Sequence, residues 1–334
     1  MPSQDPTDAS GLPRVAHDAR FVPAERLRGA PHVVVDGARL PGTELALSHW
    51  PDSGTPPALA ADTSALIVDR YLRSGAAGPE LRAVTNNHYD EDGLFGIWLL
   101  LERPPDGSPE RAMALAAAEA GDFGTWTDPW AARVAIAAMA MAERARTPFP
   151  EVGRALARAG GTDPAGELYL AILPRTGGLL ADPERYAMTW RSEWAVVERD
   201  IALLDAGEAA IDYHPAGDVA IVRAPRPLHD MAVHPRTART RVLTATPDGT
   251  LVLVHRYETW VTYASRRLPP RVDLAPLLPR LQAAERGPGR WSFDGVDPIR
   301  PRLYAGDGRG RAVPSSLEPE RVAAELAEFL APPR

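Results

Sequence analysis

The chain has no cysteine and no lysine among its 334 residues, so all 37 of its basic side chains are arginines. The absence of lysine excludes Schiff-base chemistry and the lysine-dependent nucleotide loops, since both need a primary amine. The absence of cysteine excludes thiol nucleophiles, thiolate metal sites and disulfides. Any chemistry must therefore use histidine, carboxylate, hydroxyl or arginine side chains, or a metal ion held by oxygen and imidazole. Coding bias from a GC-rich genome is the simplest explanation for the missing lysines.

Composition and charge indicate a globular chain of about two domains, with 45% apolar residues and a net charge of -7. The arginines are scattered, which argues against a general nucleic-acid surface. The longest apolar run, residues 131–142, is interrupted by Arg133 and is shorter than the ~20 residues of a membrane span. Pro2 and Asp5 stand where a secretory signal would carry basic and apolar residues. We therefore expect a cytoplasmic protein with no membrane partner.

Three segments are predicted: a disordered lead-in at residues 1–29, an α/β domain at 30–206, and a smaller α+β domain at 207–334. In the α/β domain, strands alternate with helices, which predicts a parallel sheet followed by a helical insert. The expected strands are 32–35, 44–47 and 81–85. The expected helices are 64–72, 94–101, 109–120, 129–146, 150–159, 167–173 and 185–204.

The third segment changes from helical to β-branched patterning. Strands are expected at 218–222, 240–246 and 251–257, with a turn at 247–250 between the last two. A helix near 274–285 and a strand around Trp291 follow. The final helix is expected to begin with a capping box formed by Ser315 and Glu318.

The sharpest chemical signal is the sequence His88-x-Asp90-x-Asp92-Gly93, directly after an expected strand. Alternate residues of an extended segment point the same way, so one imidazole and two carboxylates would converge. Two carboxylates that close repel each other unless a cation lies between them. Imidazole with carboxylate oxygen suits Mn, Fe, Zn or Mg. The alternative is a polar turn that caps the following helix with solvated acids.

Other strand ends carry further candidate ligands. His49 and Asp36 each follow an expected strand, at the carboxyl edge where open α/β sheets bind ligands. His49 could equally be structural, and Asp36 could serve only the turn before Gly37. Asp62 and Asp122 are candidates of the same kind, although each could simply cap a helix.

These residues resemble the DHH phosphoesterase superfamily, in a bacterial branch with rearranged motif order. His-Tyr-Asp-Glu-Asp-Gly at 88–93 is similar to its first motif. The stretch from Asp36 through Ser48-His49-Trp50-Pro51 to Asp62 is similar to the region that contains its Asp-His-His motif. The resemblance implies a metal-dependent hydrolase with manganese, or magnesium, as cofactor.

The resemblance also implies a role for each ligand. His88 and Asp90 would bind one metal ion, and His49 and Asp92 the other. Asp36 would bridge the two ions. Asp62 or Asp122 would supply the last carboxylate.

The C-terminal half resembles the superfamily's substrate-binding domain through Ser265-Arg266-Arg267 and Val272-Asp273-Leu274. Candidate substrate-binding residues are Asn87, Arg256, Arg266 and Arg267. Arg256-Tyr257-Glu258-Thr259-Trp260 is aromatic and basic, as in segments that stack on nucleotides, although strand burial explains its aromatic residues equally well. No catalytic residue is assigned.

The chain departs from the superfamily at two places. The first motif follows the Asp-His-His-like stretch instead of preceding it, and Ser48 and Trp50 replace Asp and the second His. One hypothesis is therefore a metal-dependent phosphoesterase or phosphoanhydride hydrolase acting on a small phosphorylated molecule or a short nucleotide. The alternatives are a catalytically degenerate ligand-binding or regulatory protein of the same fold, and a metal-free scaffold.

Overall fold

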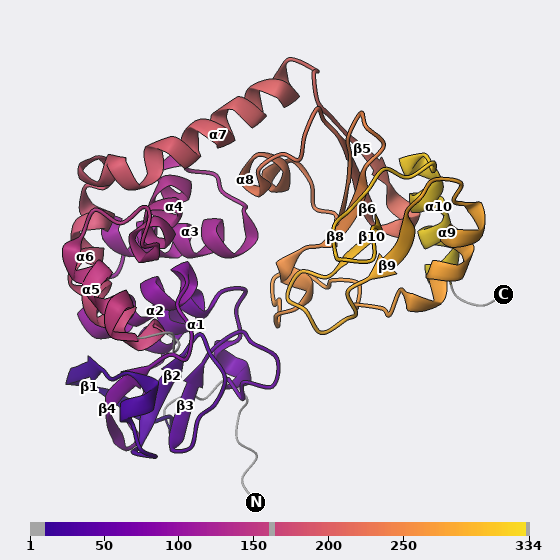
Figure 1. Ribbon diagram of the computed structural model, residues 1–334. Coiled ribbons are helices and arrows are strands. Elements are labelled where there is room, and N and C mark those ends of the chain that lie inside the picture. The colour runs from indigo at the N-terminus through magenta and orange to yellow at the C-terminus, as the bar shows by residue number, and fades with distance from the viewer. Residues whose placement is uncertain (1–10, 160–163, 332–334) are drawn as a thin grey trace, which may run out of the picture. The chain divides into compact units, whose positions relative to one another are not determined.

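The computed structural model describes residues 11–159 and 164–331 and divides into two compact units (Figure 1). The first unit comprises the chain up to Ala195 together with Val261–Arg267, and the second comprises Val196–Trp260 and Leu268–Arg334. The division falls inside helix α7 (Ala187–Asp205) instead of at the expected residue 206. The expected fold class is confirmed, because a parallel-sheet unit with many helices is followed by a mixed α and β unit.

The first unit is built on a four-stranded parallel sheet in the order β1-β4-β2-β3. Its strands are β1 (Arg14–Phe21), β2 (His32–Val35), β3 (Thr43–Leu47) and β4 (Glu80–Thr85). All four residues of β2 are buried, as expected for a central strand covered on both faces.

Strand β1 corrects the expectation of a disordered segment at residues 1–29. Arg14–Phe21 pairs in parallel with β4, and a 3-10 turn at Ala24–Arg26 follows. The polar sequence of β1 is that of an edge strand, in which only some side chains face the core. Residues 1–10 lie outside the described residues.

Helices α1 (Ser64–Arg73) and α2 (Glu91–Glu102) pack on this sheet, and further helices pack on α2 (Figure 1). Each expected helix of the first unit is found, with the N-caps Thr63, Ser108 and Asp128 accepting backbone N–H groups. The remaining helices are α3 (Pro109–Phe123), α4 (Pro129–Ala142), α5 (Pro150–Ala159), α6 (Ala165–Ala181) and the 3-10 turn Pro183–Tyr186.

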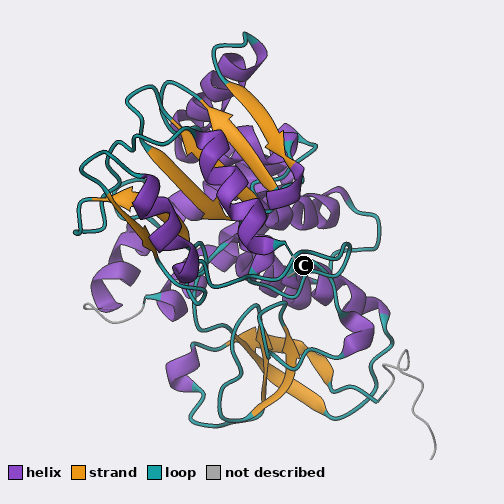
Figure 2. Ribbon diagram, turned by 90° about the vertical axis from the view of Figure 1, so that its right-hand side faces the viewer, coloured by secondary structure: helices purple, strands orange, loops and turns teal. Residues whose placement is uncertain are grey.

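The second unit contains a six-stranded mixed sheet in the order β5-β6-β7-β8-β10-β9. The strands of both sheets are drawn as orange arrows in Figure 2. The expected hairpin joins β7 (Arg241–Ala245) to β8 (Leu251–His255). The other strands are β5 (Ala210–His214), β6 (Val219–Arg223), β9 (Arg290–Phe293) and β10 (Arg302–Gly306), of which β5 and β10 were not expected.

Two apolar clusters stabilise this unit. One lies between the sheet and the helices α9 (Leu278–Ala284) and α10 (Pro319–Leu330), where Leu243 and Leu253 are fully buried. The other involves Val222, Val242 and the short helix α8 (Asp230–Val233). None of the described helices is long and apolar enough to cross a bilayer.

The capping box expected for the last helix is not formed. Glu318 is the N-cap residue and makes no side-chain capping bond. The hydroxyl of Ser315 instead donates to Glu285, 2.5 Å away. Glu285 also accepts from the backbone N–H groups of Gly287 and Ser316. The carboxylate of this residue, the C-cap of α9, therefore holds the loop in place.

Candidate metal centre

Polar side chains gather at the carboxyl edge of the parallel sheet, where β2, β3 and β4 end. Asp36 follows β2 directly, His49 is the second residue after β3, and His88 lies in the turn after β4. The backbone of Asp36 adopts a left-handed conformation with φ of 50°, which is uncommon outside glycine and favoured by Asp and Asn. Because the strands are parallel, their ends meet at one edge.

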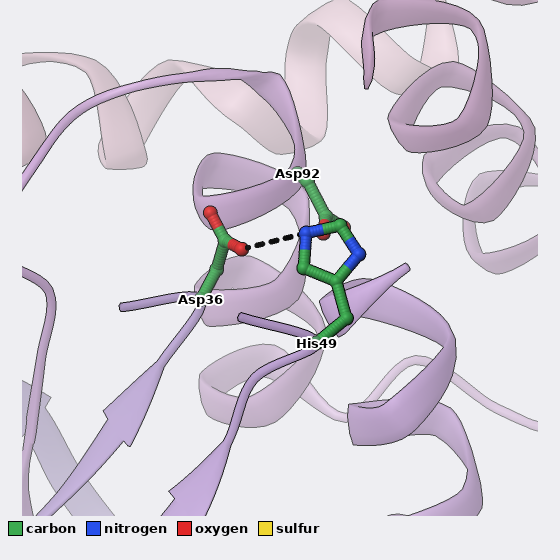
Figure 3. A group of neighbouring side chains, drawn as sticks. All are labelled: Asp36, His49 and Asp92. Carbon is green, nitrogen blue, oxygen red and sulfur yellow. Dashed lines mark ion pairs between the residues drawn. The ribbon is translucent and has the colours of Figure 1, made fainter. Parts of the chain in front are cut away.

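The first group contains Asp36, His49 and Asp92, with ligand atoms within 4.8 Å of one another (Figure 3). His49 Nε2 lies 3.4 Å from Asp36 Oδ1 and 3.7 Å from Asp92 Oδ2. Asp122, from the last turn of α3, adds a third carboxylate 3.5 Å from the same nitrogen. All four side chains are at most 4% exposed.

The second group contains Asp36, His88 and Asp90, again within 4.8 Å of one another. His88 Nε2 lies 2.7 Å from Asp90 Oδ2 and 3.2 Å from Asp36 Oδ2. The two oxygens of Asp36 therefore face different groups, since Oδ1 faces His49 and Oδ2 faces His88. This is the arrangement expected of a bridging carboxylate.

The helix starts hold two of these carboxylates in place. Asp92 accepts from the backbone N–H groups of Ser64, at 2.6 Å, and Ala65, at 2.7 Å, and so caps α1 from the first turn of α2. Asp90 is the N-cap of α2 and accepts from Gly93 N–H at 2.9 Å. The expected cap of the following helix is thus confirmed for Asp90, but the acids are not simply solvated, because Asp92 is fully buried. Capping also uses only part of the acceptor capacity, because a carboxylate has about four acceptor positions.

The tautomer of His49 is set by the backbone. Its Nδ1 lies 2.5 Å from the carbonyl oxygen of Asp62, which can only accept, so Nδ1 carries a proton. In the neutral ring, Nε2 then presents its lone pair to the carboxylates of Asp36, Asp92 and Asp122. An imidazole oriented through its other nitrogen by a carbonyl is the usual arrangement of a metal-ligating histidine.

The electrostatics of the group favour a cation. Burial raises the pKa of Asp92 and of Asp122 well above the ordinary value, and the neighbouring carboxylates raise both further. Burial also opposes ionisation of Asp36, but His88, His49 and Ser64 outweigh it and hold the pKa of Asp36 below its usual range. Burial lowers the pKa of His88, but Asp90 and Asp36 overcome this and raise it to about 11.

The donor set fits divalent metal ions. Asp36 Oδ2 and Asp122 Oδ2 are buried and accept no hydrogen bond of good geometry from the described residues, although His88 Nε2 and His49 Nε2 lie 3.2 and 3.5 Å from them. Buried acceptors of this kind need a partner. Ligand atoms 2.0 to 2.2 Å from one ion stand about 3 to 3.5 Å apart, and the separations around His49 Nε2 and Asp36 Oδ2 fall at 3.2 to 3.7 Å. Imidazole and carboxylate are the ligands that Mn, Zn and Mg accept.

The side chains of six of the seven sequence-predicted ligands therefore lie together, and the carboxylate of Asp62 does not. Its Oδ1 accepts from the backbone N–H groups of Ala264 and Ser265 at 2.7 and 2.8 Å. Asp122 instead supplies the additional carboxylate.

Three of the candidate substrate residues belong to the first unit and one to the second. Asn87 lies beside His88, and its Oδ1 is buried without a hydrogen-bond donor among the described residues. Arg256 belongs to the second unit, is 3% exposed and is ion-paired with Glu258 at 2.5 Å, so its guanidinium has a structural partner. Arg266 lies over the ring of Tyr263 at 5.5 Å, and Arg267 is exposed.

The two positions that depart from the DHH motif have structural contacts. The Ser48 hydroxyl accepts from the N–H groups of Gly37 and Trp50 and so links the turns after β2 and β3. The indole of Trp50 lies against His88, with ring centroids 4.6 Å apart and planes tilted by 38°. Trp50 therefore packs on one of the candidate ligands.

Sequence reasoning missed the contacts that support the centre. Ser64 donates its hydroxyl to Asp36 at 2.7 Å. Asn86 accepts from His88 N–H at 3.2 Å and donates to the Tyr169 hydroxyl at 2.9 Å. Gly93 is required by close packing, since a Cβ there would clash with the Tyr169 hydroxyl. Only helix α6, distant in sequence, brings Tyr169 to this position, so no local pattern could have identified it.

The fold and this site define a two-unit α/β protein with a candidate two-ion metal centre. The chain belongs to the family of unknown function DUF6687, whose sequence model matches residues 17–332. No curated protein matches it.

Two solved structures of RecJ from Thermus thermophilus, one in complex with Mn²⁺ and one with Mg²⁺, show weak similarity to this chain. Both are 14% identical to it, with TM-scores of 0.24 and 0.25. The matches cover 79% and 91% of this chain but only 42% and 50% of the RecJ chain. This chain thus spans half of RecJ or less.

Proposed function

We propose that the protein is a metal-dependent phosphohydrolase that acts on a small phosphorylated molecule or a short nucleotide. The observation that carries the proposal is the pair of ligand groups that share Asp36, one with His49 and Asp92 and one with His88 and Asp90. Two ions that share a carboxylate are characteristic of phosphatases and nucleases. The motif resemblance to DHH phosphoesterases favours the same chemistry, with Mn²⁺ as the preferred ion and Mg²⁺ as the alternative.

Each residue has a defined part in this proposal. Asp122 would hold the first ion together with His49 and Asp92, and Asp36 would take part in holding both ions. Bound ions would polarise the phosphoryl group and make a water molecule nucleophilic at neutral pH. Asn87, Arg266 and Arg267 are proposed to contact the substrate, and guanidinium groups suit phosphate because they donate two parallel hydrogen bonds.

A second candidate function is binding without turnover. Trp50 packs on His88, and Ser48 is engaged by two backbone N–H groups. Ser48 and Trp50 therefore provide neither the carboxylate nor the imidazole that DHH phosphoesterases have at these two positions. A regulatory protein that binds metal and a phosphorylated ligand would retain the ligand set and tolerate these changes.

The test combines metal analysis with a substrate panel. Protein purified without chelator should contain divalent metal, and should release phosphate or nucleotide in a Mn²⁺-dependent way from pyrophosphate, polyphosphate or dinucleotides. Asp36→Asn is the matched control, because it replaces the shared carboxylate by an amide of the same shape. Metal without turnover would support the binding protein, and absence of both would refute the metal-dependent function.

A further inference from the structure

A short segment from the C-terminal half of the sequence belongs structurally to the first unit. Val261–Arg267, called the strap below, is flanked on both sides by residues of the second unit. Its backbone is bound to the loops that follow β3. Thr262 N–H donates to the carbonyl oxygen of His49 at 2.7 Å.

The strap has a second attachment at Asp62, whose carboxylate accepts from two successive backbone N–H groups. These come from Ala264 and Ser265, at 2.7 and 2.8 Å from the same oxygen. Hydrogen bonds to an ionised acceptor are about twice as strong as neutral ones. The side chain of Asp62 is thus committed to the strap.

An aromatic contact completes the attachment. The ring of Tyr263 meets Phe123 edge to face, with centroids 5.3 Å apart. Phe123 follows Asp122 in the chain and lies 6.3 Å from the His49 ring. The strap therefore contacts the residues that surround the candidate metal centre by hydrogen bonds on one side and by ring packing on the other.

Asp62 acts on His49 as well as on the strap. Its backbone carbonyl receives the Nδ1 proton of His49 at 2.5 Å, which directs Nε2 at Asp36, Asp92 and Asp122. One residue consequently positions the imidazole through its main chain and the strap through its side chain. His49 is also bonded directly to the strap, because its own carbonyl oxygen accepts from the N–H of Thr262.

We propose that Asp62 is a positioning residue that couples docking of the strap to metal binding at His49, an inference that rests on the proposed metal-dependent function. Docking of the strap holds the loop of Asp62 and hence the orientation of His49. By thermodynamic reciprocity, an ion that binds correctly oriented His49 favours the docked strap. The strap also carries Arg266 and Arg267, so the same equilibrium controls where these side chains are presented.

The experiment uses limited trypsin digestion of the full-length chain, because Arg266 and Arg267 are cleavage sites within the strap. Cleavage there, followed by mass spectrometry, reports undocking, since proteolysis tracks local opening. In wild-type protein, Mn²⁺ should slow cleavage at these two sites by about tenfold. Asp62→Ala should be cleaved faster even without metal.

Metal affinity, measured by titration calorimetry with Mn²⁺ alone, provides the second readout. Asp62→Ala should bind Mn²⁺ about 10 to 100-fold more weakly, which is the usual cost of losing support for a ligand. Glu44→Gln is the matched control, because it removes one exposed carboxylate from β3 and should change neither readout. If Asp62→Ala fails to fold, Asp62→Asn keeps an acceptor without the charge and should give intermediate values.

The outcomes separate the coupling from the function. Wild-type protein that binds Mn²⁺ together with Asp62→Ala that binds it equally well would overturn the coupling and leave the metal-dependent function intact. Wild-type protein that binds no Mn²⁺ would refute both. Equal cleavage of metal-free wild-type and Asp62→Ala protein would refute strap docking by Asp62.

Discussion

Buried acids of the second unit and those of the candidate metal centre in the first unit are neutralised differently. In the second unit, Glu258 and Arg256 are 2% and 3% exposed and form a direct ion pair of 2.5 Å. Asp200, fully buried, is likewise paired with Arg226 at 2.5 Å and accepts from the N–H of His229. Both of these buried acids have a protein cation or donor directed at them.

At the candidate metal centre of the first unit the acids outnumber the cationic partners, in contrast to Asp69 of the same unit, which is paired with Arg111 at 2.6 Å. Asp36, Asp90, Asp92 and Asp122 converge on two imidazoles, and some of their buried oxygens lack a donor among the described residues. Since buried charges are paired or coordinate metals, these pairs of the second unit are internally complete, whereas the unbalanced acids of the first unit are the basis of the proposed metal binding.

The largest expected effect is on metal binding when the shared carboxylate is removed. Asp36→Ala should lose both ions, with affinity falling more than about 100-fold, because Asp36 belongs to both ligand groups. His88→Ala should lose one ion and keep the other. Calorimetry and metal analysis measure the stoichiometry, and Asp18→Asn, which changes an exposed acid, is the control. Two ions retained by Asp36→Ala would contradict a bridging role.

A large effect on stability is expected when the internal pair of the second unit is broken. Glu258→Gln leaves the buried guanidinium of Arg256 without its charged partner, which should cost about 3 to 5 kcal/mol of unfolding free energy. The matched control is Asp205→Asn, which breaks the exposed pair with Arg236 and should cost about 0 to 1 kcal/mol. Urea denaturation measures both, and equal losses would show that burial of the first pair is energetically unimportant.

A smaller effect concerns pH and Glu91, in the first turn of α2. Burial, together with the nearby carboxylate of Asp90, raises its pKa from 4.5 to about 8. The folded state therefore prefers the protonated acid, so this stabilisation is complete below pH 4.5 and is lost as the pH rises through about 8. In metal-free protein, Glu91→Gln should reduce the loss of stability between about pH 5 and 8 by about 1 kcal/mol, or roughly 2 to 4 °C in melting temperature.

Thermal melts of both proteins across this pH range provide the measurement. Asp248, an exposed acid of the second unit whose pKa is lowered by the hydroxyl of Thr246, supplies the contrasting variant Asp248→Asn. It should leave the slope over the same pH range unchanged. Parallel pH profiles for wild type and Glu91→Gln would contradict the assigned role of burial.

Much of the first unit was predictable because its signals are local. The strand at 32–35 and the helix that begins at Ser64 follow from β-branched runs and a cap residue, and the structure has them at those positions. Strand β1 was missed because its polar sequence lacks alternation and its pairing with β4 is a long-range contact. Strands β5 and β10 were also missed, and β10 lies between β8 and β9 in an order that no local pattern shows.

The residue types of the site were determined by the sequence itself. Without cysteine and lysine, only imidazole and oxygen ligands were available, and the spacing of His88 and Asp90 placed these two together. The expected convergence of Asp92 with them was wrong, because Asp92 lies in the first turn of α2 and joins His49 in the other group. The choice of the additional acid was decided by tertiary structure. Asp62 and Asp122 were equivalent as sequence candidates, but packing of α3 brings Asp122 to His49, and the strap, distant in sequence, engages Asp62. Long-range packing sets which acid faces the centre, because side-chain direction depends on contacts that local spacing does not encode.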